Sequence, residues 1–106
     1  MRSLVIIPTY NEIENIHKML DTVLGLQPSF DLLVVDDGSP DGTAKAVQYV
    51  QANHPQQIHL LERSGKLGLG TAYIAGFQWA LERDYQLVYE MDCDFSHNPK
   101  DLVRLR

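Results

Sequence analysis

The sequence predicts an α/β fold, a Rossmann-like and mainly parallel sheet with helices on both faces. Short runs of aliphatic and β-branched residues alternate along the chain with longer segments of helical periodicity. This alternation is typical of right-handed βαβ crossovers, which make successive strands parallel. The runs are almost continuously apolar, as expected of strands that are buried on both faces.

The first strand is predicted over residues 3–7, and Pro8 is expected to end it. Asn11 then stands in position to cap a helix, because Glu14 lies at the capping-box offset. That helix is predicted to be amphipathic and to run up to Gly25, with apolar residues at helical spacing: Ile13, Ile16, Leu20, Val23 and Leu24.

The next strand and helix pairs repeat the pattern. Strands are predicted over residues 31–35 and 58–61. The second helix follows a turn-rich cluster over residues 36–43, and the third runs from about residue 71 to residue 83 after a glycine-rich loop. The third helix is expected to bury mainly small residues: Ala72, Ala75, Gly76, Trp79 and Ala80.

The fourth strand is predicted over residues 87–91, and Asn98 with Pro99 signals the start of one more helix. Polar clusters follow every strand, over residues 8–12, 36–41, 63–70 and 92–96. In parallel α/β sheets, ligands bind outside the carboxyl ends of the strands. The sequence therefore predicts a ligand site at that edge, although each cluster taken alone is also ordinary turn sequence.

The composition limits the function classes. A chain of 106 residues is one domain at most. Its net charge of -5, from 14 acidic and 9 basic residues, argues against a nucleic-acid-binding surface, which requires clustered Lys and Arg. The apolar runs are too short for a membrane span or a signal-peptide core. A lone cysteine fits a reducing compartment, so a cytoplasmic location is expected.

Asp92 and Asp94 follow the fourth predicted strand and are separated by one residue. Extended backbone sends alternate side chains to the same side, so the two carboxylates can converge on one cation. Hard oxygen donors suit Mg²⁺ or Mn²⁺, and such ions commonly complete their coordination with substrate phosphates. An isolated pair of this kind is equally compatible with a strand-to-helix turn in which Asp94 caps a helix.

Several phrases of the sequence together resemble the inverting family 2 glycosyltransferases of GT-A fold: residues 5–12 (VIIPTYNE), 34–43 (VVDDGSPDGT) and 91–94 (MDCD). Residues 39–43, 66–72 and 94–99 are more narrowly similar to dolichol-phosphate (polyprenol-phosphate) mannosyltransferases. This resemblance implies a nucleotide-sugar donor, typically GDP-mannose, whose sugar passes to a polyprenol phosphate at a membrane. A peripheral position at the cytoplasmic membrane face follows from the same resemblance.

The resemblance also assigns roles to residues. Asp92 and Asp94 would be the catalytic pair that holds Mg²⁺ or Mn²⁺ on the diphosphate, and Ser96 stands where some relatives place a glutamine ligand, so that it would act directly or through water. Lys66 would approach the phosphate through the glycine-rich loop, or is a solvated loop lysine. The base and ribose would be bound by residues after the first two strands: Pro8, Tyr10, Glu12, and Asp36 or Asp37.

The chemistry agrees with this assignment. When the sugar leaves, negative charge builds up on the nucleoside diphosphate, and a bridging cation stabilises that charge. A polyprenol phosphate is already ionised at neutral pH and needs no protein base to attack the anomeric carbon. The sequence offers no clear base, because surface or capping roles are expected for all four histidines: His17, His54, His59 and His97.

Family members extend well beyond the length of this chain. Residues 1–106 are therefore expected to be the donor-nucleotide-binding part of a GT-A domain, truncated at the carboxyl terminus and inactive alone. Apolar surface at the truncated edge would favour aggregation or a homo-oligomer.

Three other classes compete with this interpretation. Asp92, Asp94 and Ser96 imitate the nucleophile motif of haloacid-dehalogenase-like phosphatases, with Asp92 as nucleophile, but only 12 residues follow Asp94. A dinucleotide-dependent dehydrogenase is disfavoured, because no G-x-G-x-x-G follows the first strand. A non-catalytic nucleotide-binding or interaction module is the third alternative.

Overall fold

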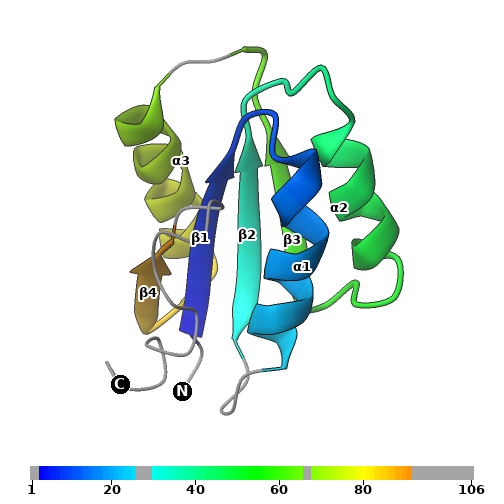
Figure 1. Ribbon diagram of the computed structural model, residues 1–106. Helices are drawn as coiled ribbons and strands as arrows, with labels where there is room; N and C mark the ends of the chain where they lie inside the picture. Colours follow the sequence, from blue (N-terminus) through cyan, green and yellow to red (C-terminus); the bar gives the residue numbers. More distant parts are fainter. Residues whose placement is uncertain (1–2, 26–29, 66–67, 92–106) are drawn as a thin grey trace.

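The computed structural model describes residues 3–25, 30–65 and 68–91. In these ranges four parallel strands form one sheet, with helices on both of its faces (Figure 1). The predicted Rossmann-like α/β class is therefore confirmed. The elements are, in chain order, β1 (Ser3–Thr9), α1 (Ile13–Leu24), β2 (Asp31–Asp36), α2 (Thr43–Gln51), β3 (Ile58–Glu62), α3 (Leu69–Leu81) and β4 (Leu87–Glu90).

The strand order, β3-β2-β1-β4, explains how the helices are divided between the faces. The chain steps outward from β1 to β2 and β3, and α3 then carries it back to the other side of β1. Right-handed crossovers that run in opposite directions place their helices on opposite faces. Accordingly, α1 and α2 cover one face and α3 covers the other (Figure 1).

The two central strands are buried on both sides, which explains their continuous apolar sequence. Alternate side chains of a strand point to opposite faces. One set packs with α1 and α2, namely Val5, Ile7, Leu32 and Val34. The other set packs with α3, namely Leu4, Ile6, Leu33 and Val35. The sheet is thus the shared wall of two cores.

Helix α3 lies close against β1 because small residues face the sheet. A Cβ added to Gly76 would lie 2.8 Å from side-chain atoms of Ile6, so only glycine fits this approach without a shift. Ala72 and Ala80 are buried on the same helix, as predicted. Ala75 and Trp79 are only half-buried, although the sequence pattern predicted that they would be buried with them.

Strand β1 continues through Pro8 to Thr9, so the prediction that Pro8 ends the strand was wrong. The Met91 N–H donates to the Ile6 carbonyl, and the Asp37 N–H donates to the Thr9 carbonyl. Even-numbered residues of β1 therefore turn their backbone groups toward β4, and odd-numbered residues turn theirs toward β2. Pro8 lacks an N–H only on the β4 side, so the ladder to β2 is unaffected.

The predicted capping box at the start of α1 was also wrong. The N-cap position is Glu12, and its side chain makes no capping hydrogen bond. Asn11 precedes it with a φ of 56°, which is left-handed backbone. The predicted bounds of the strands and of α3 differ from the observed bounds by two residues or fewer, and this includes β1, which ends at Thr9 instead of residue 7. The helix predicted from Asn98 lies outside the described residues. None of the helices in the described ranges is long and apolar enough to cross a membrane.

Candidate functional site at the carboxyl edge of the sheet

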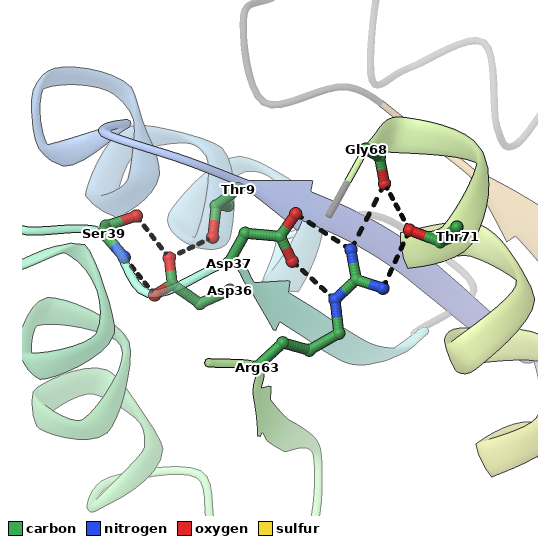
Figure 2. A network of polar contacts seen from close by, with 7 residues as sticks. All are labelled: Thr9, Asp36, Asp37, Ser39, Arg63, Gly68 and Thr71. Atoms are coloured by element: carbon green, nitrogen blue, oxygen red, sulfur yellow. Dashed lines mark hydrogen bonds and ion pairs between the residues drawn. The ribbon is translucent and has the colours of Figure 1, made fainter. Parts of the chain in front are cut away.

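The carboxyl ends of three neighbouring strands bring polar residues together at one edge (Figure 2). Thr9 ends β1 and lies opposite Asp36, which ends β2, and Asp36 lies opposite Glu62 at the end of β3. The ladder extends one step further, because the Arg63 N–H donates to the Asp36 carbonyl at 2.7 Å. The edge predicted from the polar clusters therefore exists for these three strands.

Asp36 is a buried carboxylate whose described partners are all uncharged. It is 1% exposed. Its Oδ1 accepts hydrogen bonds from the hydroxyls of Thr9 at 2.7 Å and Ser39 at 2.6 Å, and its Oδ2 accepts the Ser39 N–H at 3.0 Å. These donors replace the water that the carboxylate loses on burial. Asp36 therefore fastens the turn after β2 to the end of β1.

Asp37 instead pairs with a cation. The Arg63 Nε donates to Oδ1 at 2.6 Å and Nη2 donates to Oδ2 at 2.9 Å, which is the bidentate geometry of strong arginine–carboxylate pairs. The two side chains are 11% and 8% exposed. Arg63 also donates to the Thr71 hydroxyl at 3.0 Å and to the Gly68 carbonyl at 3.2 Å. In Figure 2 its guanidinium lies between Asp37 and the start of α3, so it joins β2, β3 and α3.

The segment after β1 is held by side chains of the segment after β2. Three consecutive backbone N–H groups each donate to an oxygen of the other loop: Asn11 to Ser39 Oγ at 2.8 Å, Glu12 to Thr43 Oγ1 at 3.0 Å, and Ile13 to Asp41 Oδ2 at 3.1 Å. The first N–H groups of α1 are thus satisfied from a distant loop. This is the physical reason why α1 needs no cap of its own.

Asp41 serves two helices at once. Its Oδ1 accepts the Thr43 N–H at 3.0 Å and the Thr43 hydroxyl, while its Oδ2 accepts the first N–H of α1. Desolvation by itself would raise the pKa of Asp41, but the hydrogen bonds from the Thr43 side chain and from the N–H groups of Ile13 and Thr43 outweigh it. The pKa of Asp41 consequently lies below its ordinary value.

The predicted nucleoside-binding residues lie at the ends of the neighbouring strands β1 and β2 and in the segment that joins β1 to α1. Pro8 is buried in β1, and Tyr10 and Glu12 are half-buried just beyond its end. Asp36 and Asp37 are buried at the end of β2. The structure therefore brings this predicted set together at one edge. The Glu12 carboxylate also accepts a hydrogen bond from the side-chain amide of Asn15, at 3.4 Å.

The predicted metal and phosphate ligands, Asp92, Asp94, Ser96 and Lys66, lie outside the described residues. Strand β4, which leads to Asp92, pairs with β1 up to Glu90 opposite Ile6. Within the ranges that the structure describes, no group of three or more His, Cys, Asp or Glu residues could hold a metal ion.

Sequence analysis missed several residues of this edge, above all Arg63. One signal was present, since Arg63 directly follows β3 and Asp37 directly follows β2, so neighbouring parallel strands place them side by side. Ser39, Asp41 and Thr43 were recognised as turn chemistry and as part of a resemblance. Their contacts to residues 11–13 span 28 or more positions along the chain and have no local sequence signal.

Comparison with known proteins identifies the family. The model of glycosyl transferase family 2 matches residues 4–105. The chain belongs to this family. It is 49% identical over 104 residues to the polyprenol monophosphomannose synthase of Mycolicibacterium smegmatis, covering 98% of this chain and 39% of that protein. It is 52% identical over 105 residues to the undecaprenyl-phosphate mannosyltransferase of Micrococcus luteus, covering 99% and 43%.

A solved member of the same fold class extends the comparison to three dimensions. The mannosyltransferase PcManGT from Pyrobaculum calidifontis, in complex with GDP-Man and Mn2+, superposes with a TM-score of 0.82 at 28% identity, covering 96% of this chain and 30% of that chain. The predicted GT-A fold is confirmed. Family 2 membership favours the glycosyltransferase interpretation over the phosphatase and dehydrogenase alternatives. The chain spans 39% and 43% of the length of the curated relatives it matches.

Proposed function

We propose that residues 1–106 form the donor-nucleotide-binding part of an inverting, metal-dependent GT-A glycosyltransferase that moves mannose from GDP-mannose to a polyprenol phosphate. The observation that carries the proposal is the identity of 49% and 52%, across nearly the whole chain, to two relatives named for mannose transfer to polyprenol phosphates. The solved relative that holds GDP-Man and Mn2+ supports the donor and a divalent cation.

The described edge supports a nucleoside site after β1 and β2. Tyr10 and Glu12 are half-buried there, so part of each side chain remains accessible, and the N–H of Glu12 is held by Thr43. Asp36 and Asp37 lie beneath with their carboxylates already bonded to protein donors, which holds the edge rigid. Either carboxylate would contact the nucleoside from this fixed position.

Asp92 and Asp94, with Ser96, would hold Mg²⁺ or Mn²⁺ on the diphosphate. Their oxygen donors are of the hard type that these ions prefer. They follow β4, next to β1, where the strand order reverses and where doubly wound sheets bind their ligands. When bound, the cation stabilises negative charge on the departing nucleoside diphosphate. Lys66 would add a positive charge to the same phosphates.

The acceptor does not need a protein side chain to remove a proton from it. A polyprenol phosphate is ionised at neutral pH, and attack on the face opposite the leaving group inverts the anomeric centre. The described histidines lie away from the network at the edge, with His17 on α1, His54 in the turn before β3 and His59 on β3. Because the acceptor is a membrane lipid, we place the protein peripherally at the cytoplasmic face of the membrane.

Calorimetric titration of the chain with GDP, UDP and ADP, each with Mn²⁺ and with chelator, tests the proposal. We expect preferential GDP binding that disappears with chelator and in the Asp94→Ala variant. Asp21→Asn is the control. Asp21 is exposed on α1, so this substitution also removes one negative charge, but at a position away from the edge. A folded chain that binds none of the nucleotides, or binds them equally without metal, would contradict the proposal.

A further inference from the structure

The segment formed by residues 10–12 connects β1 to α1 and carries Tyr10 and Glu12, two residues of the proposed nucleoside site. Its backbone is held from outside. Three successive N–H groups, beginning at Asn11, donate to Ser39, Thr43 and Asp41, at distances between 2.8 and 3.1 Å. The position of the segment is therefore set by the 39–43 segment, which belongs to a different strand and helix pair.

The 10–12 segment does not hold this shape by its own chemistry. Glu12 occupies the N-cap position without a side-chain capping bond. Asn11 has a φ of 56°, in the left-handed region, which asparagine tolerates better than other non-glycine residues but which still costs more than right-handed backbone. Such backbone persists where the surrounding structure over-determines it. Here the surrounding structure is the Ser39 hydroxyl, which receives the N–H of Asn11 itself.

The 39–43 segment is in turn anchored to the core. The Ser39 hydroxyl and N–H both donate to Asp36, which is 1% exposed. Thr43 is fully buried, and its backbone and hydroxyl both donate to Asp41. A continuous set of hydrogen bonds thus runs from a buried carboxylate of the sheet to the backbone beneath Tyr10 and Glu12.

From these contacts we infer that Ser39, Asp41 and Thr43 are positioning residues that hold Tyr10 and Glu12 in place and thereby set the selectivity for the nucleobase. Asp41 is central, because its two oxygens accept the first N–H groups of α1 and α2 and so fix the starts of both helices relative to each other. The inference rests on the proposed function, since it concerns the nucleoside of the same donor.

The test is the calorimetric titration with GDP and UDP in Mn²⁺, applied to Asp41→Ala, Asp41→Asn and the control Asp21→Asn. If the competent arrangement falls to about a tenth of the population, GDP affinity falls about tenfold in Asp41→Ala. Because the inference makes recognition of the guanine base depend on the ordered 10–12 segment, UDP affinity should fall less than GDP affinity, so the preference for GDP shrinks while the binding stoichiometry stays unchanged. Asp41→Asn keeps one acceptor oxygen, so its GDP affinity should lie between those of Asp41→Ala and the unchanged chain. Asp21→Asn should behave like the unchanged chain.

A second pair of variants separates positioning from damage to the fold. Thr43→Val removes the hydroxyl that receives the Glu12 N–H, at nearly constant volume, whereas Thr43→Ser keeps it. We expect Thr43→Val to lose nucleobase preference and Thr43→Ser to retain it. A role in folding alone would lower the stoichiometry in both variants and leave the ratio of the GDP and UDP affinities unchanged, which would overturn the inference.

A double-variant cycle shows whether Asp41 acts through Glu12. If it does, Glu12→Ala combined with Asp41→Ala should weaken GDP binding by less than the sum of the two single changes. Additive losses would mean that Asp41 acts independently, and would overturn the inference while leaving the proposed function intact. Absence of GDP binding by the unchanged chain would instead overturn the proposed function, and the inference with it.

Discussion

Two latches hold the carboxyl edge of this sheet, and they differ in chemistry and exposure. The first is the bidentate ion pair between Arg63 and Asp37, 11% and 8% exposed, which joins β2, β3 and α3. The second consists of the hydrogen bonds that Asp36 accepts from Thr9 and Ser39, together with those that Asp41 accepts at the starts of α1 and α2. The arginine–carboxylate latch should govern stability, and the second latch, which is buried at Asp36 and exposed at Asp41, should govern the position of residues 10–12.

The largest effect is expected from Arg63→Ala, which removes the bidentate ion pair of the buried Asp37 carboxylate. Breaking a buried pair by removing one member costs about 3 to 5 kcal/mol of unfolding free energy. Arg63→Lys should cost less, since lysine keeps the charge but cannot form the bidentate contact. Urea denaturation followed by circular dichroism measures both. A loss in Arg63→Ala as small as that of an exposed pair would show that this latch does not dominate stability.

A smaller loss is expected when one hydroxyl is removed from the buried carboxylate of the second latch. Thr9→Val deletes the donor at 2.7 Å from Asp36 while keeping the side-chain shape. Hydrogen bonds to charged groups contribute about 1.5 to 3 kcal/mol, and Ser39 still donates in this variant. Thr9→Ser, which retains the hydroxyl, is the matched control in the same denaturation experiment. Equal losses in the two variants would assign the effect to packing instead.

The exposed end of the second latch should respond to pH. The pKa of Asp41 is lowered from its ordinary value of 3.8, so its ionised form is favoured by folding. Its contribution to stability is therefore fully present above pH 3.8 and is lost as the pH falls through the lower folded pKa. The urea midpoints of the unchanged chain and of Asp41→Asn should converge over that acidic range. A difference that stays constant or widens on acidification would contradict this linkage.

The smallest effect is expected at an ion pair outside both latches. Arg83 lies 3.4 Å from Glu82, with side chains that are 43% and 72% exposed. Exposed pairs of this kind contribute about 0 to 1 kcal/mol, so Glu82→Gln should leave the urea midpoint almost unchanged. Comparison with Arg63→Ala then indicates how much more a buried arginine–carboxylate pair contributes to the free energy of unfolding than an exposed one. If Glu82→Gln lowered the free energy of unfolding as much as Arg63→Ala, the expected difference between the exposed and the buried ion pair would be contradicted.

The fold could be predicted from the sequence because its signals are local. The apolar runs that become β1 and β2, and the spacing of Ile16, Leu20 and Val23 in α1, each depend on neighbouring residues. The latches could not be predicted in the same way. Arg63 and Asp37 are 26 positions apart, and Asn11 and Ser39 are 28 apart, so each contact exists only once the strand order is known.

The start of α1 illustrates why local rules failed at the site itself. Asn11 and Glu14 have the types and spacing of a capping box, and in an isolated peptide that local solution would compete well. In the folded chain the 39–43 segment supplies better placed acceptors for the same N–H groups. The assignment of Asp92, Asp94, Ser96 and Lys66 stays a prediction, because these residues lie outside the described ranges.

Pro8 gives the edge an asymmetry that no change of solvent can remove. Its ring withholds a donor on the side of β4 and leaves the side of β2 untouched, where the pairing continues to Thr9 opposite Asp36. Hydrogen bonds that open and close with temperature or pH do not create this step; a covalent bond does. The loss of this one donor on the β4 side is therefore fixed by the sequence before the chain folds.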